Sequence, residues 1–253
     1  LQAGNETLRI MAGPNGSIQG PCEAKWGYTT ISAADWDHDG RTDILANSIW
    51  GRIVWYRNLG PGASGQPRLS EAQPVTVEWP GRTPKPSWTW WNPVGKELVT
   101  QWRTTPEAVD FNADGLTDLV MLDQEGYLSF FERTQDATGL HLQPGQRIFE
   151  DEQGDTLRLN AKSAGGSGRR KLHLVDWDND GDLDLLTNST NADLYENTGR
   201  TPDGHVTLHH RGAIGQRKLA GHTSSPASID LNNNGRMDLL IGAEDGHLYL
   251  MSR

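Results

Sequence analysis

Four copies of one nine-residue pattern constrain this chain more than any other feature. Each copy reads Asp, an apolar residue, Asp or Asn, any residue, Asp or Asn, Gly, two further residues and Asp. The copies begin at Asp35, Asp110, Asp176 and Asp230, so successive copies start 54 to 75 residues apart. Five constrained positions do not recur four times by chance, and the recurrence predicts a repeat architecture.

The chemistry of the pattern fits calcium. Ca2+ takes six to eight oxygen ligands at about 2.3–2.6 Å. Side-chain oxygens at positions 1, 3, 5 and 9 and the peptide carbonyl of position 7 can supply them, because glycine at position 6 permits a sharp turn. The predicted ligands are Asp35, Asp37, Asp39, Arg41 and Asp43; Asp110, Asn112, Asp114, Leu116 and Asp118; Asp176, Asp178, Asp180, Asp182 and Asp184; and Asp230, Asn232, Asn234, Arg236 and Asp238.

The alternative is that these loops are Asp-rich turns without metal, since Asp, Asn and Gly are ordinary turn residues. This alternative is strongest for the fourth loop, which has two aspartates and three asparagines. It is weakest for the third loop, because five aspartates within nine residues repel one another unless a cation is bound.

The acidic charge is concentrated in the loops. The net charge is −10, from 33 acidic and 23 basic residues, and fourteen of the acids lie in the four loops. The remaining 19 acids are outnumbered by the bases, so the rest of the chain carries a small positive charge. The acidity therefore belongs to specific sites and is not a general solvating surface.

The residues around each loop predict β-strands. An EF-hand would end in Glu at position 12 and continue into a helix, whereas here Asp at position 9 runs into apolar stretches such as Leu119-Val120-Met121. Each stretch is followed by a turn and an aromatic strand. We expect an all-β fold: a β-propeller with at least four four-stranded blades and a calcium loop between the first and second strand of each.

The expected organisation is one domain over residues 1–253, as a whole propeller or as part of a larger, seven-bladed one. Residues 61–93, rich in Pro, Gly and Trp, are expected to form an irregular insertion or an irregular extra blade. Thr7–Met11 is expected to supply the outer strand of the last blade. The repeats are placed near residues 26–79, 101–160, 168–212 and 220–253.

The loops and their spacing resemble the FG-GAP/VCBS class of calcium-binding β-propellers. The head of integrin α subunits and many secreted bacterial carbohydrate-active proteins belong to this class. The resemblance extends from Tyr28 to Met251. It implies bound Ca2+ and a secreted, cell-surface or periplasmic location, but it does not select an activity, because this fold serves adhesion, lectins and polysaccharide lyases alike.

Basic and aromatic residues precede the first strand of each repeat, at the end of the blade away from the calcium loops. Such a set suits an anionic polysaccharide or oligosaccharide, because Arg binds a uronate carboxylate bidentately and indole faces stack on sugars. If the chain is a lyase, His222 or Tyr28 would be the base, and Arg103 and Arg170 would neutralise the carboxylate. The predicted substrate-binding residues are Trp26, Trp102, Arg103, Arg169, Arg170, Lys171, Arg217 and Lys218.

Three functions remain open at this stage: a polysaccharide lyase, a non-catalytic glycan-binding module and a protein-adhesion head. These side chains could also simply cap the ends of blades. Most other tryptophans are expected in the core, above all Trp36 and Trp177 at position 2 of their loops.

Several functions are excluded. The lone Cys22 rules out an internal disulfide and a cysteine-based zinc site. Gly165–Gly168 lacks the Gly-Lys-Ser/Thr of a phosphate loop, so nucleotide binding is not expected. Nucleic acid is not expected as a partner either. No apolar run approaches the length of a membrane span, and Leu1 opens into polar sequence without a leader peptide, so we expect a mature form, an excised piece or a cytosolic protein. Further blades or domains of a longer chain are expected partners.

Overall fold

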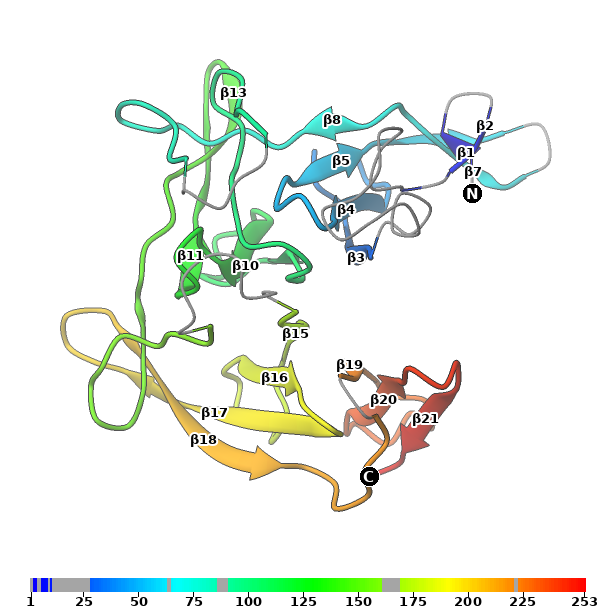
Figure 1. The fold of residues 1–253 in the computed structure, drawn as a ribbon, viewed down its shortest axis with the longest axis vertical. Helices are drawn as coiled ribbons and strands as arrows, with labels where there is room; N and C mark the ends of the chain where they lie inside the picture. Colours follow the sequence, from blue (N-terminus) through cyan, green and yellow to red (C-terminus); the bar gives the residue numbers. More distant parts are fainter. Residues whose placement is uncertain are drawn as a thin grey trace. The chain divides into compact units, whose positions relative to one another are not determined.

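The computed structural model describes residues 2–3, 6–8, 10, 28–62, 65–85, 91–160, 169–220 and 223–253. These residues form strands and turns and contain no helix (Figure 1), which confirms the predicted all-β class. Trp26, His222 and Cys22 lie outside the described residues. The chain divides into two compact units, Leu1–Gln146 with Asn160–Gly168, and Arg147–Leu159 with Arg169–Arg253.

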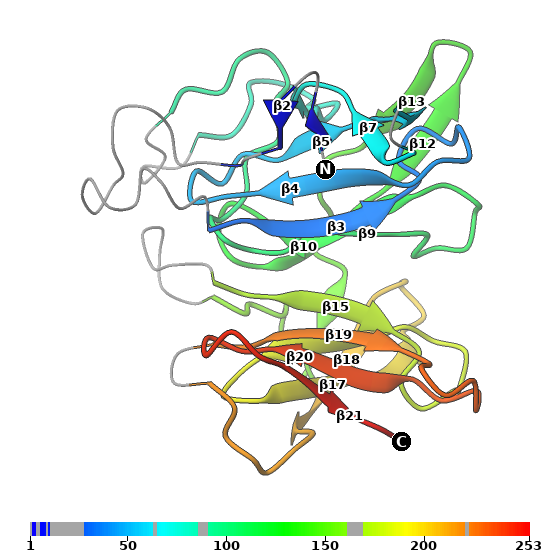
Figure 2. The ribbon, with the colours of Figure 1, turned by 90° about the vertical axis from the view of Figure 1, so that its right-hand side faces the viewer.

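The first unit contains the first two repeats. The first sheet has the order β3-β4-β5-β8 and is antiparallel, and Figure 2 shows its first two strands side by side. The second sheet has the order β11-β10-β9. Their strands are β3 (Thr30–Ala34), β4 (Asp43–Asn47), β5 (Val54–Tyr56), β8 (Gln73–Pro74), β9 (Glu107–Val109), β10 (Asp118–Leu122) and β11 (Leu128–Phe131).

Two smaller sheets complete this unit. The hairpin of β12 (Arg133–Asp136) and β13 (Gly139–Leu142) follows the second sheet directly. The other sheet has the order β2-β1-β7-β6, from β1 (Gln2–Ala3), β2 (Glu6–Thr7), β6 (Asn58–Pro61) and β7 (Pro67–Leu69).

Of the predicted outer strand Thr7–Met11, Arg9 and Met11 lie outside the described residues. Thr7 lies in β2 and is the partner of Gln2 in β1. β1 in turn pairs with β7, where Gln2 is the partner of Arg68 and Ala3 of Leu69, so the described part of this segment joins the first unit. The reason is apolar packing, because Ala3, Leu8 and Ile10 contact the buried cluster that contains Tyr56 and Leu69.

Residues 61–93 are more than an insertion. They include β8, the fourth strand of the first sheet. Val75 and Val77 are buried in the same core as Leu45 and Leu119, so part of this stretch belongs to the repeat itself.

The second unit contains the third and fourth repeats. Its larger sheet has the order β14-β18-β17-β16-β15, with β17 and β18 as a long hairpin (Figure 1). Its smaller sheet has the order β19-β20-β21. The strands are β14 (Phe149–Glu150), β15 (Leu172–Val175), β16 (Asp184–Asn188), β17 (Ala192–Arg200), β18 (Val206–Ala213), β19 (Ser225–Ile229), β20 (Asp238–Gly242) and β21 (Leu248–Met251).

The second strand of each repeat lies between the first and third strands of its sheet and is largely buried. All five residues of β10 and all five of β16 are buried, as expected for a strand covered on both faces. Trp36 and Trp177 are 3% and 7% exposed, which confirms that they are core residues. In all four repeats the Asp-rich loop joins the first strand to the second, so the fold places the loops as predicted.

Candidate metal loops and ligand pocket

All four loops are closed by the same backbone hydrogen bonds. The aspartate at position 1 accepts the amide N–H groups of positions 5 and 6, at 2.9 to 3.1 Å. The side chain at position 5 accepts the N–H of position 7, at 2.8 to 3.1 Å. These bonds fix the side chains of positions 1 and 5 within the loop.

Two positions of each loop have left-handed backbone. Gly at position 6 has φ between 81° and 97°, as the pattern predicted. Position 4 is also left-handed, with φ of 58° at His38, 60° at Ala113, 64° at Asn179 and 56° at Asn233. The sequence pattern treated position 4 as unconstrained, although asparagine in two of the four loops was a signal, since Asn tolerates this conformation better than most residues.

The aspartate at position 9 braces the loop to the sheet. Asp43, Asp118, Asp184 and Asp238 are 0–1% exposed. In the third loop one oxygen of Asp184 accepts the N–H of Trp177 at 2.9 Å, and the other accepts the N–H of Asn197, on the third strand, at 2.7 Å. The other three loops make the same pair of bonds, at 2.6 to 3.2 Å. Position 9 therefore has a structural role beside its predicted role as a metal ligand.

Burial of the position 9 aspartates raises the pKa of two of them. Desolvation raises the pKa of Asp118 and of Asp184 to about 6, although backbone hydrogen bonds oppose the shift. Because the pKa is higher in the folded state than in the unfolded state, the ion-free loops lose stability as the pH rises from about 4 to 6. A bound cation would favour the ionised carboxylate and offset this loss.

The donor set fits a hard cation. Carboxylate oxygens of Asp35, Asp37 and Asp39 lie within 4.8 Å of one another, and those of Asp176, Asp178 and Asp180 do the same. Oδ1 of Asp37 is buried and has no hydrogen-bond partner, as expected of an oxygen shaped for a metal. Calcium coordination by positions 1, 3, 5, 7 and 9 remains a prediction, which this arrangement of oxygens supports.

Arg103, predicted to bind a substrate carboxylate, is buried. Its side chain is 3% exposed, and its guanidinium lies 3.9 Å from the ring centroid of Tyr28 and 5.2 Å from that of Trp102. Trp102 is itself buried against Ile49. Desolvated cation–π contact draws this arginine into the fold, so Trp102, Arg103 and Tyr28 form one packed cluster.

The other predicted basic residues lie in the second unit. The turn between β16 and β17 contacts two of the segments that carry these basic residues. The Lys171 N–H donates to Asn188 Oδ1 at 2.8 Å, and Asn191 Nδ2 donates to the Arg217 carbonyl at 2.8 Å. Arg217 lies 5.4 Å from the Tyr249 ring and lines a pocket of about 280 Å³. Lys218 is exposed, whereas Arg169 and Arg170 are half-buried. Their predicted role in substrate binding remains a prediction.

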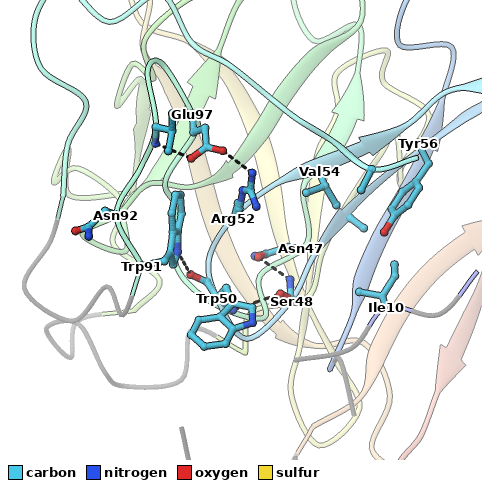
Figure 3. A pocket seen from close by; sticks show the side chains of 13 residues that line it. Ile10, Asn47, Ser48, Trp50, Arg52, Val54, Tyr56, Trp91, Asn92 and Glu97 are labelled. Atoms are coloured by element: carbon cyan, nitrogen blue, oxygen red, sulfur yellow. Dashed lines mark hydrogen bonds and ion pairs between the residues drawn. The ribbon is translucent and has the colours of Figure 1, made fainter. Parts of the chain in front are cut away.

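A larger pocket of about 560 Å³ lies in the first unit and was missed by the sequence analysis. Trp50, Trp91, Tyr56 and Arg52 line it (Figure 3). The Trp91 indole N–H donates to the Trp50 carbonyl at 2.7 Å, which fixes the ring. Arg52 donates to Glu97 at 2.5 Å and lies 5.7 Å from the Trp91 ring centroid. The available signal was the Trp-rich end of residues 61–93 beside the turn at Ser48–Gly51.

These features define a class: a β-propeller-like all-β protein with an acidic loop between the first two strands of each repeat. The FG-GAP-like repeat family matches residues 110–187 and residues 176–241, together more than half of the chain. The chain belongs to the FG-GAP-like repeat family.

Other comparisons give little more. The Photorhabdus luminescens Tc holotoxin pore, in a structure with a mutation in TccC3, contains a chain with 15% identity and a TM-score of 0.42. That alignment covers 87% of this chain but 9% of the toxin chain, so this chain spans a small part of its length. No curated protein matches the sequence. Among the described strands and turns there is no helix long and apolar enough to cross a membrane.

A chelator experiment should distinguish the structural role of the position 9 aspartate from the metal-binding role predicted for the position 3 aspartate. With calcium removed, Asp184→Asn should lower the free energy of unfolding by about 1–3 kcal/mol, because an amide cannot accept both backbone N–H groups. Asp178→Asn, at an exposed position 3, should change stability little in chelator but reduce the increase in melting temperature that calcium gives the parent. Equal losses for both variants in chelator would contradict the assignment of the brace.

The number of carboxylates in each loop should set the order of calcium affinity among the loops. The side chains of Asp180 and Asn234 both accept the position 7 N–H, at 2.9 and 2.8 Å. Asn234 also donates to the Arg253 carbonyl at 2.8 Å, so each variant is compared with its own melting temperature in chelator. Because calcium affinity rises with ligand charge, Asp180→Ala should lower the melting temperature in calcium more than Asn234→Ala does. The reverse order would show that the backbone frame sets affinity.

Strain at position 4 should be measurable. Ala113 and Asn179 are both exposed and left-handed. Ala113→Asn should stabilise the protein by about 0.5–1 kcal/mol and Asn179→Ala should destabilise it by a similar amount, because alanine is penalised in this conformation. Urea denaturation in saturating calcium measures both changes, and a loss of stability in Ala113→Asn would contradict the interpretation.

Proposed function

We propose that this chain is a calcium-stabilised, β-propeller-like binding module for an acidic, uronate-containing glycan. The observation that carries the proposal is the pocket of the first unit, which Trp50, Trp91, Tyr56 and Arg52 line together, with Arg52 over the Trp91 ring. Aromatic side chains with a few fixed polar groups are typical of small-molecule sites.

The pocket has the groups that a charged sugar needs. Indole faces offer flat apolar surfaces for the C–H faces of a sugar ring, and Trp91 is held in place by its bond to Trp50. Glu97 is 5% exposed, lies behind Arg52 and also accepts the Val94 N–H at 2.8 Å. Glu97 therefore orients the guanidinium, while the Arg52 side chain remains 43% exposed and can meet a carboxylate.

Calcium has a structural role in this proposal. β4 begins at Asp43 of the first loop and ends at Asn47, next to the turn that carries Trp50. The ion would thus stabilise one end of the strand while the glycan binds at the other. Calcium sites of extracellular modules have dissociation constants of about 10⁻⁴–10⁻³ M, and a module with such loops suits a secreted or cell-surface protein.

Cleavage of the glycan is not required by the pocket. Of the two predicted bases, His222 lies outside the described residues, and Tyr28 packs against Arg103. Lyase activity therefore stays a prediction, checked by ultraviolet absorbance of unsaturated uronate during the binding assay below.

Binding of uronate and neutral oligosaccharides, measured by calorimetry in calcium, tests the proposal. Trp91→Ala should abolish detectable binding, because a stacking platform is lost. Arg52→Gln should weaken uronate binding by about 1–3 kcal/mol, the range for charge-assisted hydrogen bonds, and should leave neutral sugars unaffected. Arg68→Gln, an exposed arginine of the same unit outside the pocket, is the matched control. Equal binding of acidic and neutral sugars by the parent would refute the acidic specificity.

A further inference from the structure

The first loop contains two cations from its own chain: Arg41, at position 7 of the loop, is paired with Asp39, and Arg57, from outside the loop, reaches both Asp37 and Asp39. Nε of Arg57 lies 2.5 Å from Oδ2 of Asp37, and its Nη2 lies 2.9 Å from Oδ2 of Asp39. These are the side chains of positions 3 and 5, two of the predicted calcium ligands. The guanidinium thus occupies part of the space toward which the loop directs its oxygens.

The equivalent position in the other repeats is not basic. Arg57 directly precedes Asn58, whose N–H bonds to the position 9 aspartate. The residues that precede the corresponding N–H donors in the second, third and fourth repeats are Glu132, Glu196 and Ser252. The four loops share one backbone frame, so this difference in charge separates the first loop from the rest.

The guanidinium satisfies the loop incompletely. Its donors lie in one plane, whereas calcium accepts six to eight oxygens from all directions. Oδ1 of Asp37 stays buried and without a hydrogen-bond partner beside Arg57. A calcium ion can therefore still gain oxygen ligands in the first loop, but the positive charge of Arg57 repels it.

Displacement of the side chain leaves the strand intact. The N–H of Arg57 donates to Ser70 Oγ at 3.0 Å, and its carbonyl accepts the Ser70 N–H at 2.8 Å. The side chain is 40% exposed, so it can rotate into solvent while its backbone remains paired.

We propose that Arg57 is the resident counter-ion of the first loop, and that calcium must displace it to bind there. The first loop then binds Ca2+ more weakly than its four aspartates would otherwise allow, and fills after the second and third loops as calcium rises. Without calcium, Arg57 keeps the crowded carboxylates together. The inference rests on the proposed calcium function and adds the regulation of one site.

A luminescence titration isolates this loop. Tb3+ is excited by a nearby indole, and Trp36 and Trp177 mark the first and third loops, whereas Phe111 and Leu231 occupy that position in the others. In an Asp178→Asn, Asp180→Asn background, indole-sensitised Tb3+ emission and its displacement by Ca2+ report the first loop. Arg57→Gln should then tighten Ca2+ binding by about tenfold or more, because a positive charge beside a divalent ion is removed. Arg68→Gln should have no effect.

The reciprocal change tests the same idea at another loop. Glu132→Arg should weaken Ca2+ binding at the second loop, as resolved by calorimetry. Unchanged or weaker binding at the first loop in Arg57→Gln, with calcium binding intact at the second loop, would overturn the counter-ion role alone. If calorimetry finds no calcium binding at any loop of the parent, the calcium function fails as well.

Discussion

The buried aspartate at position 9 is the interaction on which each repeat depends. Its two oxygens accept the N–H of position 2 and an N–H in or just after the third strand. One carboxylate therefore fixes the loop, the second strand and the chain that leaves the third strand. In Asp118 these bonds measure 3.0 and 2.7 Å. A buried carboxylate that accepts two backbone N–H groups is expensive to replace, which explains why this position is Asp in all four repeats while positions 3 and 5 accept Asn.

The repeats also come in pairs. In the first unit the guanidinium of Arg133 lies 3.9 Å from the ring centroid of Trp36, and in the second unit that of Arg253 lies 4.1 Å from Trp177. Each arginine also donates to the carbonyl of its tryptophan, at 3.3 and 2.5 Å, and its own N–H bonds to a position 9 aspartate. The brace of one repeat is thus coupled to the loop of the preceding one. The same arginine–tryptophan contact occurs in both units, which indicates that a pair of repeats is the structural unit of this chain.

The sequence predicted what depends on local pattern and missed what depends on distant contact. The loops, their glycine turns and the buried Trp36 and Trp177 follow from spacing alone. The burial of Arg103 does not, because it needs Tyr28, which lies 75 positions earlier in the chain, to pack on its guanidinium. Nor could the pattern show that Arg57, outside the nine residues, reaches Asp37 and Asp39.

The two ends of the second strand of the first repeat, β4, carry different kinds of side chain. One end carries the acidic loop, and the other end carries the aromatic and basic residues of the pocket. At one end the backbone frame gathers carboxylates that repel one another, so that end gains stability from a cation, whether an ion or Arg57. At the other end the turn after β4 is free of this constraint and presents Trp50 beside Arg52. A strand whose interior is fully buried, as in β10 and β16, transmits rigidity from the first end to the second without contact between the sites. In the proposed function, calcium would stabilise the pocket without touching it, because loop and pocket are anchored to opposite ends of β4, in which four of five residues are buried.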